Sequence, residues 1–597
     1  MRQEFRHIAT SDIPVPVRCA NGSISALFWT AFATAVAVIA FDLLNAHYRD
    51  VDDVLRTVQI RQLLAHGSWF DLTISGIDMP GPYLSPWSRL VDFPYVLLSL
   101  ALRTMTSEAN AIWWAFRIWQ PLLVMVFCAL WVQTAVRLSG SDRLVAPLHV
   151  VAAFSLMPLT LWEFSPGRID HHNVQIVVLM LALFGIARWS AIGGFLAGVA
   201  CGLSFVIGLE LAPALLILMI GPGLAWIGGV AGSQRVQIFV SVGLAVTTLL
   251  AGLLLLGPSR LFATECDALS APFVMAFLGY ALITIVVVGT IRSTHASIRF
   301  TALALPAFGL AVALAVYFPD CLRGPYQGID TLVRSLWLDR VQQEKSFLDF
   351  YRVGELIKIV CLGLVVIVAV GVLPQIRQRL RHGDAAFVII FAVAVLLVIL
   401  TFLQTRFIRF PAAFVVLFLP LVWGEVKFGV RATRTMVLSG AAVTLVGGAI
   451  LTRVQPFEPF RPILLDYLAL DLCTDIDASP FESISPGRIV APSSLGLFLL
   501  DRLPPGMTVN SIPFHRAAPG MRRMYDVFTS TDGETRRTAA EPFDYLAVCR
   551  YPLVAEIPND TMFAVLTRGG DWPGLIPIFD SASSALRLFK IDHARLQ

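Results

Sequence analysis

Long apolar stretches separated by short polar loops fill the chain from residue 25 to residue 455. A helix needs roughly 20 apolar residues to cross a bilayer, and about thirteen stretches meet or approach that length. The pattern therefore predicts a polytopic α-helical membrane protein with about 13 transmembrane helices. The stretches lie near residues 25–45, 112–136, 144–162, 173–188, 190–208, 210–229, 236–256, 272–291, 300–318, 355–374, 386–404, 410–425 and 436–452.

The polar loops predict how these helices cross the membrane. Cytoplasmic loops are enriched in Lys and Arg, and every predicted inner loop is basic if the N-terminal segment 1–24 lies inside. An odd number of helices then places residues 456–597 outside the cytoplasm, together with the outer loops 46–111, 162–173 and 319–354. The basic residues of the inner loops are Arg137, Arg143, Arg188, Arg235, Arg292, Arg299, Arg377, Arg379, Arg381, Lys427, Arg431 and Arg434.

The pattern changes after residue 455, where charged residues, Pro and Gly interrupt short apolar runs. The runs at 487–492, 544–549, 563–567 and 586–591 are typical of strands, and 494–503 of a short helix. A length of roughly 140 residues is normal for one domain. We expect a soluble α/β or α+β domain outside the membrane.

Composition agrees with this division. Of the 597 residues, 56% are hydrophobic and only 14% are charged, whereas soluble domains are about a quarter charged. The formal net charge of +4 is small, and we expect no nucleic-acid partner. The 8 cysteines form no CxxC pair, so their spacing does not indicate a zinc or redox motif.

Two outer loops carry residues suited to metal binding. Asp52 follows the first predicted helix, in HYRDVDDVLR, and Asp170, His171 and His172 lie in SPGRIDHHN. Oxygen and imidazole ligands together suit Mn²⁺, Zn²⁺ or similar ions, and ionisable groups at membrane depth are usually functional. The alternatives are a solvated helix start with acids favoured by the helix dipole, and incidental histidines in a solvated loop.

Two further outer positions carry charge. Glu344 lies in the loop 319–354, and Arg406 and Arg409 lie at the mouth of two helices, in QTRFIRFP. Such an Arg either snorkels to lipid headgroups or binds phosphate through its planar fork of donors. If the outer loops converge, their residues form a site for a divalent ion and a lipid phosphate at the outer leaflet.

These motifs resemble those of the membrane-embedded GT-C glycosyltransferases, especially the catalytic subunit of oligosaccharyltransferase and its bacterial relatives. Asp52 matches the family's catalytic Asp, which follows the first span and precedes a helix that runs to a Gly. Asp170-His171-His172 fits its Asp-x-His metal motif, and Glu344 in VQQE matches the Glu of its long outer loop. Arg406 or Arg409 matches the Arg that binds the donor diphosphate. The family's WWD motif is missing, since Trp572 is the only Trp after residue 455.

The resemblance implies a metal-dependent, inverting glycosyltransferase that uses a polyprenyl-phosphate- or diphosphate-linked sugar donor. Asp52, Asp170 and His172 would hold Mn²⁺ or Mg²⁺, with His171 as an alternate ligand. Asp52 would also orient or deprotonate the acceptor, which is a glycan, lipid or protein. The implied location is the bacterial inner membrane, with residues 456–597 in the periplasm.

Two other classes of protein fit many of the same features. A transporter or flippase for lipid-linked sugars would explain the many helices, but the sequence shows no paired halves with broken helices. A non-catalytic subunit for envelope-glycan assembly would tolerate changes at Asp170, His171 and His172.

The cysteines predict a disulfide outside the cytoplasm, where disulfides persist. Cys266 and Cys321 lie in neighbouring predicted outer loops, and their bond would clamp the base of the loop that bears Glu344. Cys473 and Cys549 are a second candidate pair. The alternative is that these are small buried residues, as free cysteines often are. Cys19, Cys128, Cys201 and Cys361 should stay reduced because they fall in the cytoplasm or in helices.

The predicted orientation is testable with a reporter fused after Gln597. The basic inner loops predict an extracytoplasmic signal, for example an active alkaline phosphatase fusion and an inactive cytoplasmic reporter. The opposite pattern would mean that the number of helices is even.

Overall fold

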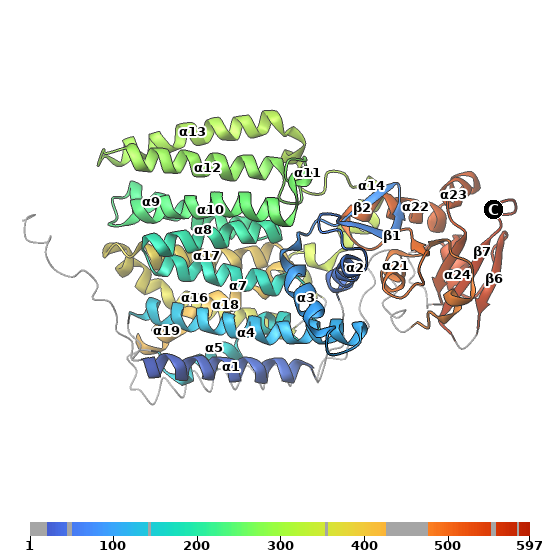
Figure 1. Cartoon of the computed structure of the whole chain (residues 1–597), viewed down its shortest axis with the longest axis horizontal. Helices are drawn as coiled ribbons and strands as arrows, with labels where there is room; N and C mark the ends of the chain where they lie inside the picture. Colours follow the sequence, from blue (N-terminus) through green and yellow to red (C-terminus); the bar gives the residue numbers. More distant parts are fainter. Residues whose placement is uncertain are drawn as a thin grey trace, which may run out of the picture.

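The computed structural model describes residues 21–43, 50–140, 145–352, 356–425, 468, 476–550, 557–581 and 584–597. Helices dominate it, and the chain is a multi-pass membrane protein. Two apolar cores organise the described residues: one lies among the membrane helices, and the other surrounds a sheet built mainly after residue 485. Figure 1 shows the helical part on one side and the sheet on the other.

Seven described helices are long and apolar enough to span a membrane. A bent pair, α5 (Pro147–Ser155) and the segment Pro158–Phe164, meets at 73° and counts as an eighth if it is one span. The predicted span near 436–452 lies outside the described residues, so the count of about thirteen is not confirmed. The seven are α1 (Asn21–Leu43), α4 (Glu108–Ser139), α10 (Ser233–Leu255), α12 (Ala271–Thr290), α13 (Ala296–Tyr317), α16 (Leu356–Arg381) and α17 (Ala385–Leu403).

Shorter apolar helices complete the helical part. They coincide with predicted stretches but are of 10–17 residues, below full spanning length. They are α7 (His172–Ala187), α8 (Ala191–Ile207), α9 (Ala212–Ile227) and the segment Pro411–Trp423, within which lie α18 (Pro411–Val415), η8 (Val416–Phe418) and most of α19 (Leu419–Glu425).

The first outer loop supplies two strands to the C-terminal sheet, which the sequence analysis did not foresee. The strand order is β2-β1-β4-β3-β5-β7-β6, and β1 pairs in parallel with β4 through Ile77 and Val509. The loop is thereby tied to residues more than 400 positions later. The strands are β1 (Thr73–Met79), β2 (Gly81–Leu84), β3 (Arg488–Val490), β4 (Thr508–Val509), β5 (Tyr545–Cys549), β6 (Leu575–Asp580) and β7 (Leu586–Ile591).

Most C-terminal predictions agree with the structure, with one correction. The run 563–567 forms part of helix α24 (Met562–Thr567) rather than a strand, because a short buried apolar run fits either element. The remaining helices and 3₁₀ segments are α2 (Val51–His66), α3 (Arg89–Leu102), α6 (Pro158–Leu161), η3 (Trp162–Phe164), α11 (Pro258–Leu261), η4 (Pro319–Arg323), α14 (Thr331–Leu336), η5 (Leu338–Arg340), η6 (Gln342–Glu344), α15 (Phe347–Arg352), η7 (Thr405–Arg409), η11 (Ser479–Ser483), α21 (Ser493–Leu500), η12 (His515–Ala517), α22 (Ala518–Thr529) and α23 (Gly533–Ala540).

Glycines allow α8 and α10 to approach closely. A Cβ added at Gly194 would lie 2.6 Å from the carbonyl oxygen of Val236, and one at Gly198 would overlap the carbonyl oxygen of Val240. Gly198 follows Gly194 by four residues, so both lie on one face of α8. Small residues at this spacing let membrane helices pack backbone to backbone.

Gly198→Ala should therefore destabilise the protein by about 1–3 kcal/mol, since the added methyl group forces the helices apart. Gly309→Ala is the matched control, because a Cβ at Gly309 in α13 meets nothing within 4 Å. Thermal unfolding in detergent should show a lower midpoint for the first variant only. Equal midpoints for the two would contradict the close packing.

Candidate active site

The N-terminus of α2 presents the first group of carboxylates. Asp50 caps the helix: its side chain accepts a hydrogen bond from the backbone N–H of Val51 at 2.6 Å. Asp52 and Asp53 occupy the first turn, where the helix dipole favours negative charge. Asp53 is buried, while Asp52 keeps some exposure on the wall of a cavity.

Asp53 ties α2 to the turn that precedes α7. Its carboxylate accepts hydrogen bonds from the backbone N–H groups of Ile169 at 2.8 Å and Asp170 at 3.0 Å. The turn reverses direction at Gly167, whose φ of +91° suits glycine. The segments 50–53 and 165–172, which are distant in sequence, are therefore held together by hydrogen bonds from backbone N–H groups to the Asp53 side chain.

Arg168 balances the charge of these carboxylates. Its guanidinium lies 3.1 Å from Asp53, 2.9 Å from Glu163 and 3.2 Å from Asp170. It also stacks over Trp162, with 4.0 Å between the guanidinium carbon and the ring centroid. Arg168 is 5% exposed, so its replacement by a neutral residue would remove a positive charge that several buried carboxylates share.

Four predicted metal ligands lie together, and we call them the metal group. One ligand atom from each of Asp52, Asp170, His171 and His172 lies within 4.8 Å of all the others. The Nε2 atom of His172 is 3.4 Å from Asp170 Oδ2. The Nδ1 atom of His171 is 2.6 Å from Asp170 Oδ1, but outside hydrogen-bond geometry. Converging oxygen and imidazole donors fit a divalent cation.

The surroundings shift the pKa values of Asp52 and Asp170 in opposite directions. Burial, reinforced by the charge of Asp170, raises the pKa of Asp52 well above its usual range. Burial also opposes ionisation of Asp170, but His172 and His171 outweigh it and hold the pKa of Asp170 well below its usual range. A cation among these side chains would favour the ionised form of both carboxylates.

The two candidate phosphate-binding arginines have different surroundings. Arg406 lines the cavity, and its guanidinium lies 2.8 Å from Glu344. Arg409 is buried and lies 3.1 Å from Glu163 and 3.7 Å from Asp170. Arg406 is therefore available to a ligand in the cavity, whereas Arg409 pairs with Glu163 and with Asp170 of the metal group.

Glu344 lies beside Arg406 rather than in the metal group. It accepts hydrogen bonds from the Tyr326 hydroxyl at 3.1 Å and the Gln404 amide at 3.2 Å. The backbone N–H of Thr405 donates to the carbonyl of Lys345 at 2.9 Å. These bonds hold the loop 319–354 against the segment that carries Arg406.

Glu210 joins the site, although the sequence analysis did not single it out. It lies between α8 and α9, 2.8 Å from Nδ1 of His172 and 3.7 Å from the guanidinium of Arg406. Burial opposes its ionisation, but the neighbouring His172 outweighs this and holds the pKa of Glu210 well below its usual range. One sequence signal was available: Glu210 is the only charged residue between Arg188 and Arg235.

A cavity of about 410 Å³ opens beside the metal group. Its polar lining includes Asp52, His171, Glu210 and Arg406, together with Asp267 and His515. Its apolar lining comes from the helices and from the loops beside them. The apolar and aromatic lining residues include Phe205, Leu256, Leu269, Phe273, Trp87, Tyr326 and Phe514.

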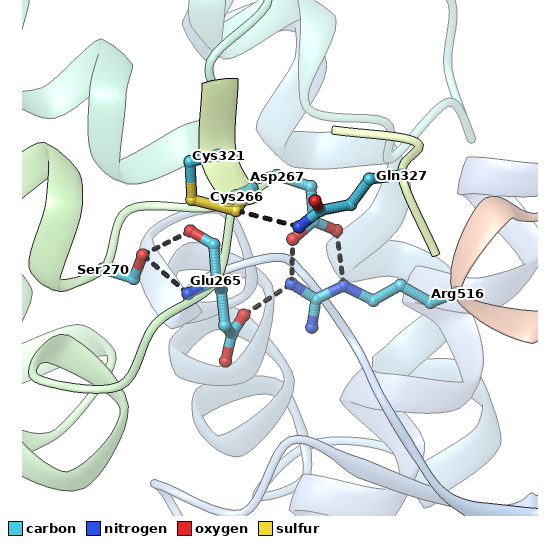
Figure 2. Close-up of a disulfide and its surroundings, with 7 residues drawn as sticks. All are labelled: Glu265, Cys266, Asp267, Ser270, Cys321, Gln327 and Arg516. Atoms are coloured by element: carbon cyan, nitrogen blue, oxygen red, sulfur yellow. Dashed lines mark hydrogen bonds and ion pairs between the residues drawn. A yellow bond between two sulfur atoms is a disulfide. The ribbon is translucent and has the colours of Figure 1, made fainter. Parts of the chain in front are cut away.

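The outer wall of this cavity is held by a disulfide and an ionic clasp (Figure 2). Cys266 and Cys321, the pair that the sequence analysis predicted, are bonded with 5.0 Å between their Cα atoms. Next to them, Arg516 donates to Asp267 at 2.6 Å and also pairs with Glu265. The clasp joins the segment after Phe514 to the loop between α10 and α12.

The other described cysteines include one that is disulfide-bonded and three that are free. Cys549 is disulfide-bonded, and its predicted partner Cys473 lies outside the described residues, as does Cys19. Among the described residues, three cysteines are free: Cys128, Cys201 and Cys361.

Comparison with known proteins shows similarity in fold but not in sequence. No family model matches the chain, and no curated protein matches its sequence. The archaeal oligosaccharyltransferase AglB from Archaeoglobus fulgidus, in complex with an inhibitory peptide and a dolichol-phosphate, matches with a TM-score of 0.62 and 11% identity, over 88% of this chain and 69% of that one. The chain has the fold of this oligosaccharyltransferase. The resemblance to the GT-C glycosyltransferases is thereby confirmed at the level of fold.

Two other structures of the Archaeoglobus fulgidus oligosaccharyltransferase also match the fold of this chain. A complex with Zn and sulfate gives a TM-score of 0.59 and 12% identity, over 95% of this chain and 73% of that one. A form tethered to an acceptor peptide with the NVT sequon gives a TM-score of 0.60 and 12% identity, over 96% of this chain and 74% of that one.

The disulfide predicts how the cysteines react with an alkylating reagent. In denatured protein that has not been reduced, Cys266 and Cys321 should be unmodified, and both should react after reduction. Cys128 is the control, since it is free and should react in both samples once unfolded. Peptide mapping by mass spectrometry reads the result, and modification of Cys266 and Cys321 before reduction would contradict the bond.

Proposed function

We propose that this protein is a metal-dependent, inverting glycosyltransferase. It moves a sugar or oligosaccharide from a polyprenyl-phosphate or polyprenyl-diphosphate donor to an acceptor outside the cytoplasm. The observation that carries the proposal is the convergence of Asp52, Asp170, His171 and His172 beside a cavity that also exposes Arg406. This combination of donors suits a divalent ion and a phosphate at adjacent positions.

Asp52, Asp170 and His172 would hold the cation, Mn²⁺ or Mg²⁺, with His171 as an alternate ligand. When bound, the cation would neutralise negative charge on the donor phosphate. Asp52 is the ligand that also reaches the cavity, so it would orient or deprotonate the acceptor group.

Arg406 is the better candidate to stabilise the departing phosphate, because it lines the cavity and Arg409 does not. Arg409 would instead hold Glu163 and Asp170 in place. Glu344 would serve the acceptor side, as its place in the long outer loop implies. It now pairs with Arg406, so donor binding would have to compete with this contact.

One archaeal structure contains a dolichol-phosphate, which supports a lipid-linked donor. Another contains Zn and sulfate, which supports a divalent cation. We do not propose the sequon-containing acceptor of the archaeal structure for this chain, because the WWD motif is missing from it. We propose that residues 25–455 form the membrane domain in a bacterial inner membrane. Residues 456–597 would form a periplasmic domain that shapes the acceptor side.

Metal dependence is the direct test. Transfer is measured as the formation of a glycoconjugate that is absent from cells lacking the gene. A chelator should abolish transfer by the purified protein, and Mn²⁺ or Mg²⁺ should restore it.

Asp170→Asn should lower the rate roughly 100-fold or more, because it removes charge at the centre of the group. Asp78→Asn is the control, since Asp78 forms a partly exposed ion pair with Arg488 on the sheet and such pairs contribute little. Full activity of Asp170→Asn would contradict this role of Asp170, and full activity after exhaustive chelation would refute the metal-dependent mechanism.

A further inference from the structure

Glu210 is a largely buried charged residue that the proposed chemistry does not use. It lies in the turn between Ile207, where α8 ends, and Ala212, where α9 begins, and its side chain is 11% exposed. The sequence on both sides of Glu210 carries no other charged residue between Arg188 and Arg235. An ionisable group at such a position is costly to keep, which indicates a functional reason for it.

The contact with His172 determines which ring nitrogen of this histidine is free. Glu210 Oε1 lies 2.8 Å from Nδ1, and Gln175 Oε1 lies 3.1 Å from the same atom. Both neighbours are acceptors, so Nδ1 carries a hydrogen and donates it. In the neutral ring Nε2 then has the lone pair, and Nε2 is the atom that lies 3.4 Å from Asp170 Oδ2.

The second carboxylate oxygen of Glu210 lies near Arg406, the proposed phosphate-binding arginine. Oε2 lies 3.7 Å from the guanidinium of Arg406, whose other nitrogen pairs with Glu344 at 2.8 Å. One carboxylate thus contacts both a metal-ligand histidine and the arginine of the cavity. Its two oxygens set the position of one side chain relative to the other.

We propose that Glu210 is a positioning residue that holds His172 in the tautomer and orientation needed to bind the cation, and that anchors Arg406 beside it. The inference rests on the proposed function and adds a residue to it. Metal-bound histidines commonly donate their second ring N–H to a carboxylate, which fixes the ring and raises its basicity. Glu210 supplies this carboxylate from a different helix pair.

Binding of Mn²⁺ alone to the detergent-purified full chain tests the proposal without substrate. Glu210→Gln preserves the shape of the side chain but removes its charge, and it should weaken Mn²⁺ binding by about 10- to 100-fold. Asp501→Asn is the matched control: Asp501 is also a partly buried carboxylate, but it pairs with Arg61 and belongs neither to the metal group nor to the cavity lining. The affinity of this variant for Mn²⁺ should match that of the unmodified protein.

A double-mutant cycle separates positioning from general damage to the fold. If Glu210 acts through His172, Glu210→Gln should cause no further loss of Mn²⁺ affinity in a His172→Ala background. An equal loss in both backgrounds would overturn the proposal, and so would unchanged affinity in Glu210→Gln alone.

Asp170→Asn distinguishes failure of this inference from failure of the proposed function. If Asp170→Asn loses Mn²⁺ and Glu210→Gln does not, only the role of Glu210 is wrong. If Asp170→Asn binds Mn²⁺ as tightly as the unmodified protein does, the metal site itself is wrong, and the inference is refuted with it.

Discussion

The candidate site depends on the ion pairs of one buried guanidinium, that of Arg168. It lies between carboxylates from two segments, Asp53 on α2 and Glu163 and Asp170 around the turn before α7. None of these carboxylates could be buried alone, since an unpaired charge away from water costs several kcal/mol. The pairing therefore requires the two segments to meet.

This meeting determines the chemistry of the site. Once Asp53 has bonded the backbone of Ile169 and Asp170, Asp52 is brought next to Asp170 and the histidine pair. Arg168 and Arg409 both pair with Asp170, but neither arginine lines the cavity. The side that faces the cavity keeps carboxylate and imidazole groups that a cation can bind.

The long apolar helices and the convergence of Asp52 with Asp170 could be predicted from local signals. Apolar length indicates a span without knowledge of its neighbours. The basic loops predict that Asp52 and Asp170 lie on the same side of the membrane, so their convergence could be expected. The parallel pairing of β1 with β4 could not, because it joins residues far apart in a register that neither strand specifies alone. The role of Glu210 depends on packing between α7 and the turn before α9, which a single charge in an apolar run does not reveal.

The central claim is that aspartate and histidine from two outer segments bind a divalent cation. Pulsed electron paramagnetic resonance of the protein with bound Mn²⁺ tests it most directly, with histidine labelled with ¹⁵N to identify the ligand nitrogen. The account predicts a coupling between Mn²⁺ and an imidazole nitrogen that disappears in His172→Ala. Stoichiometric Mn²⁺ binding without any histidine nitrogen coupling would contradict the account.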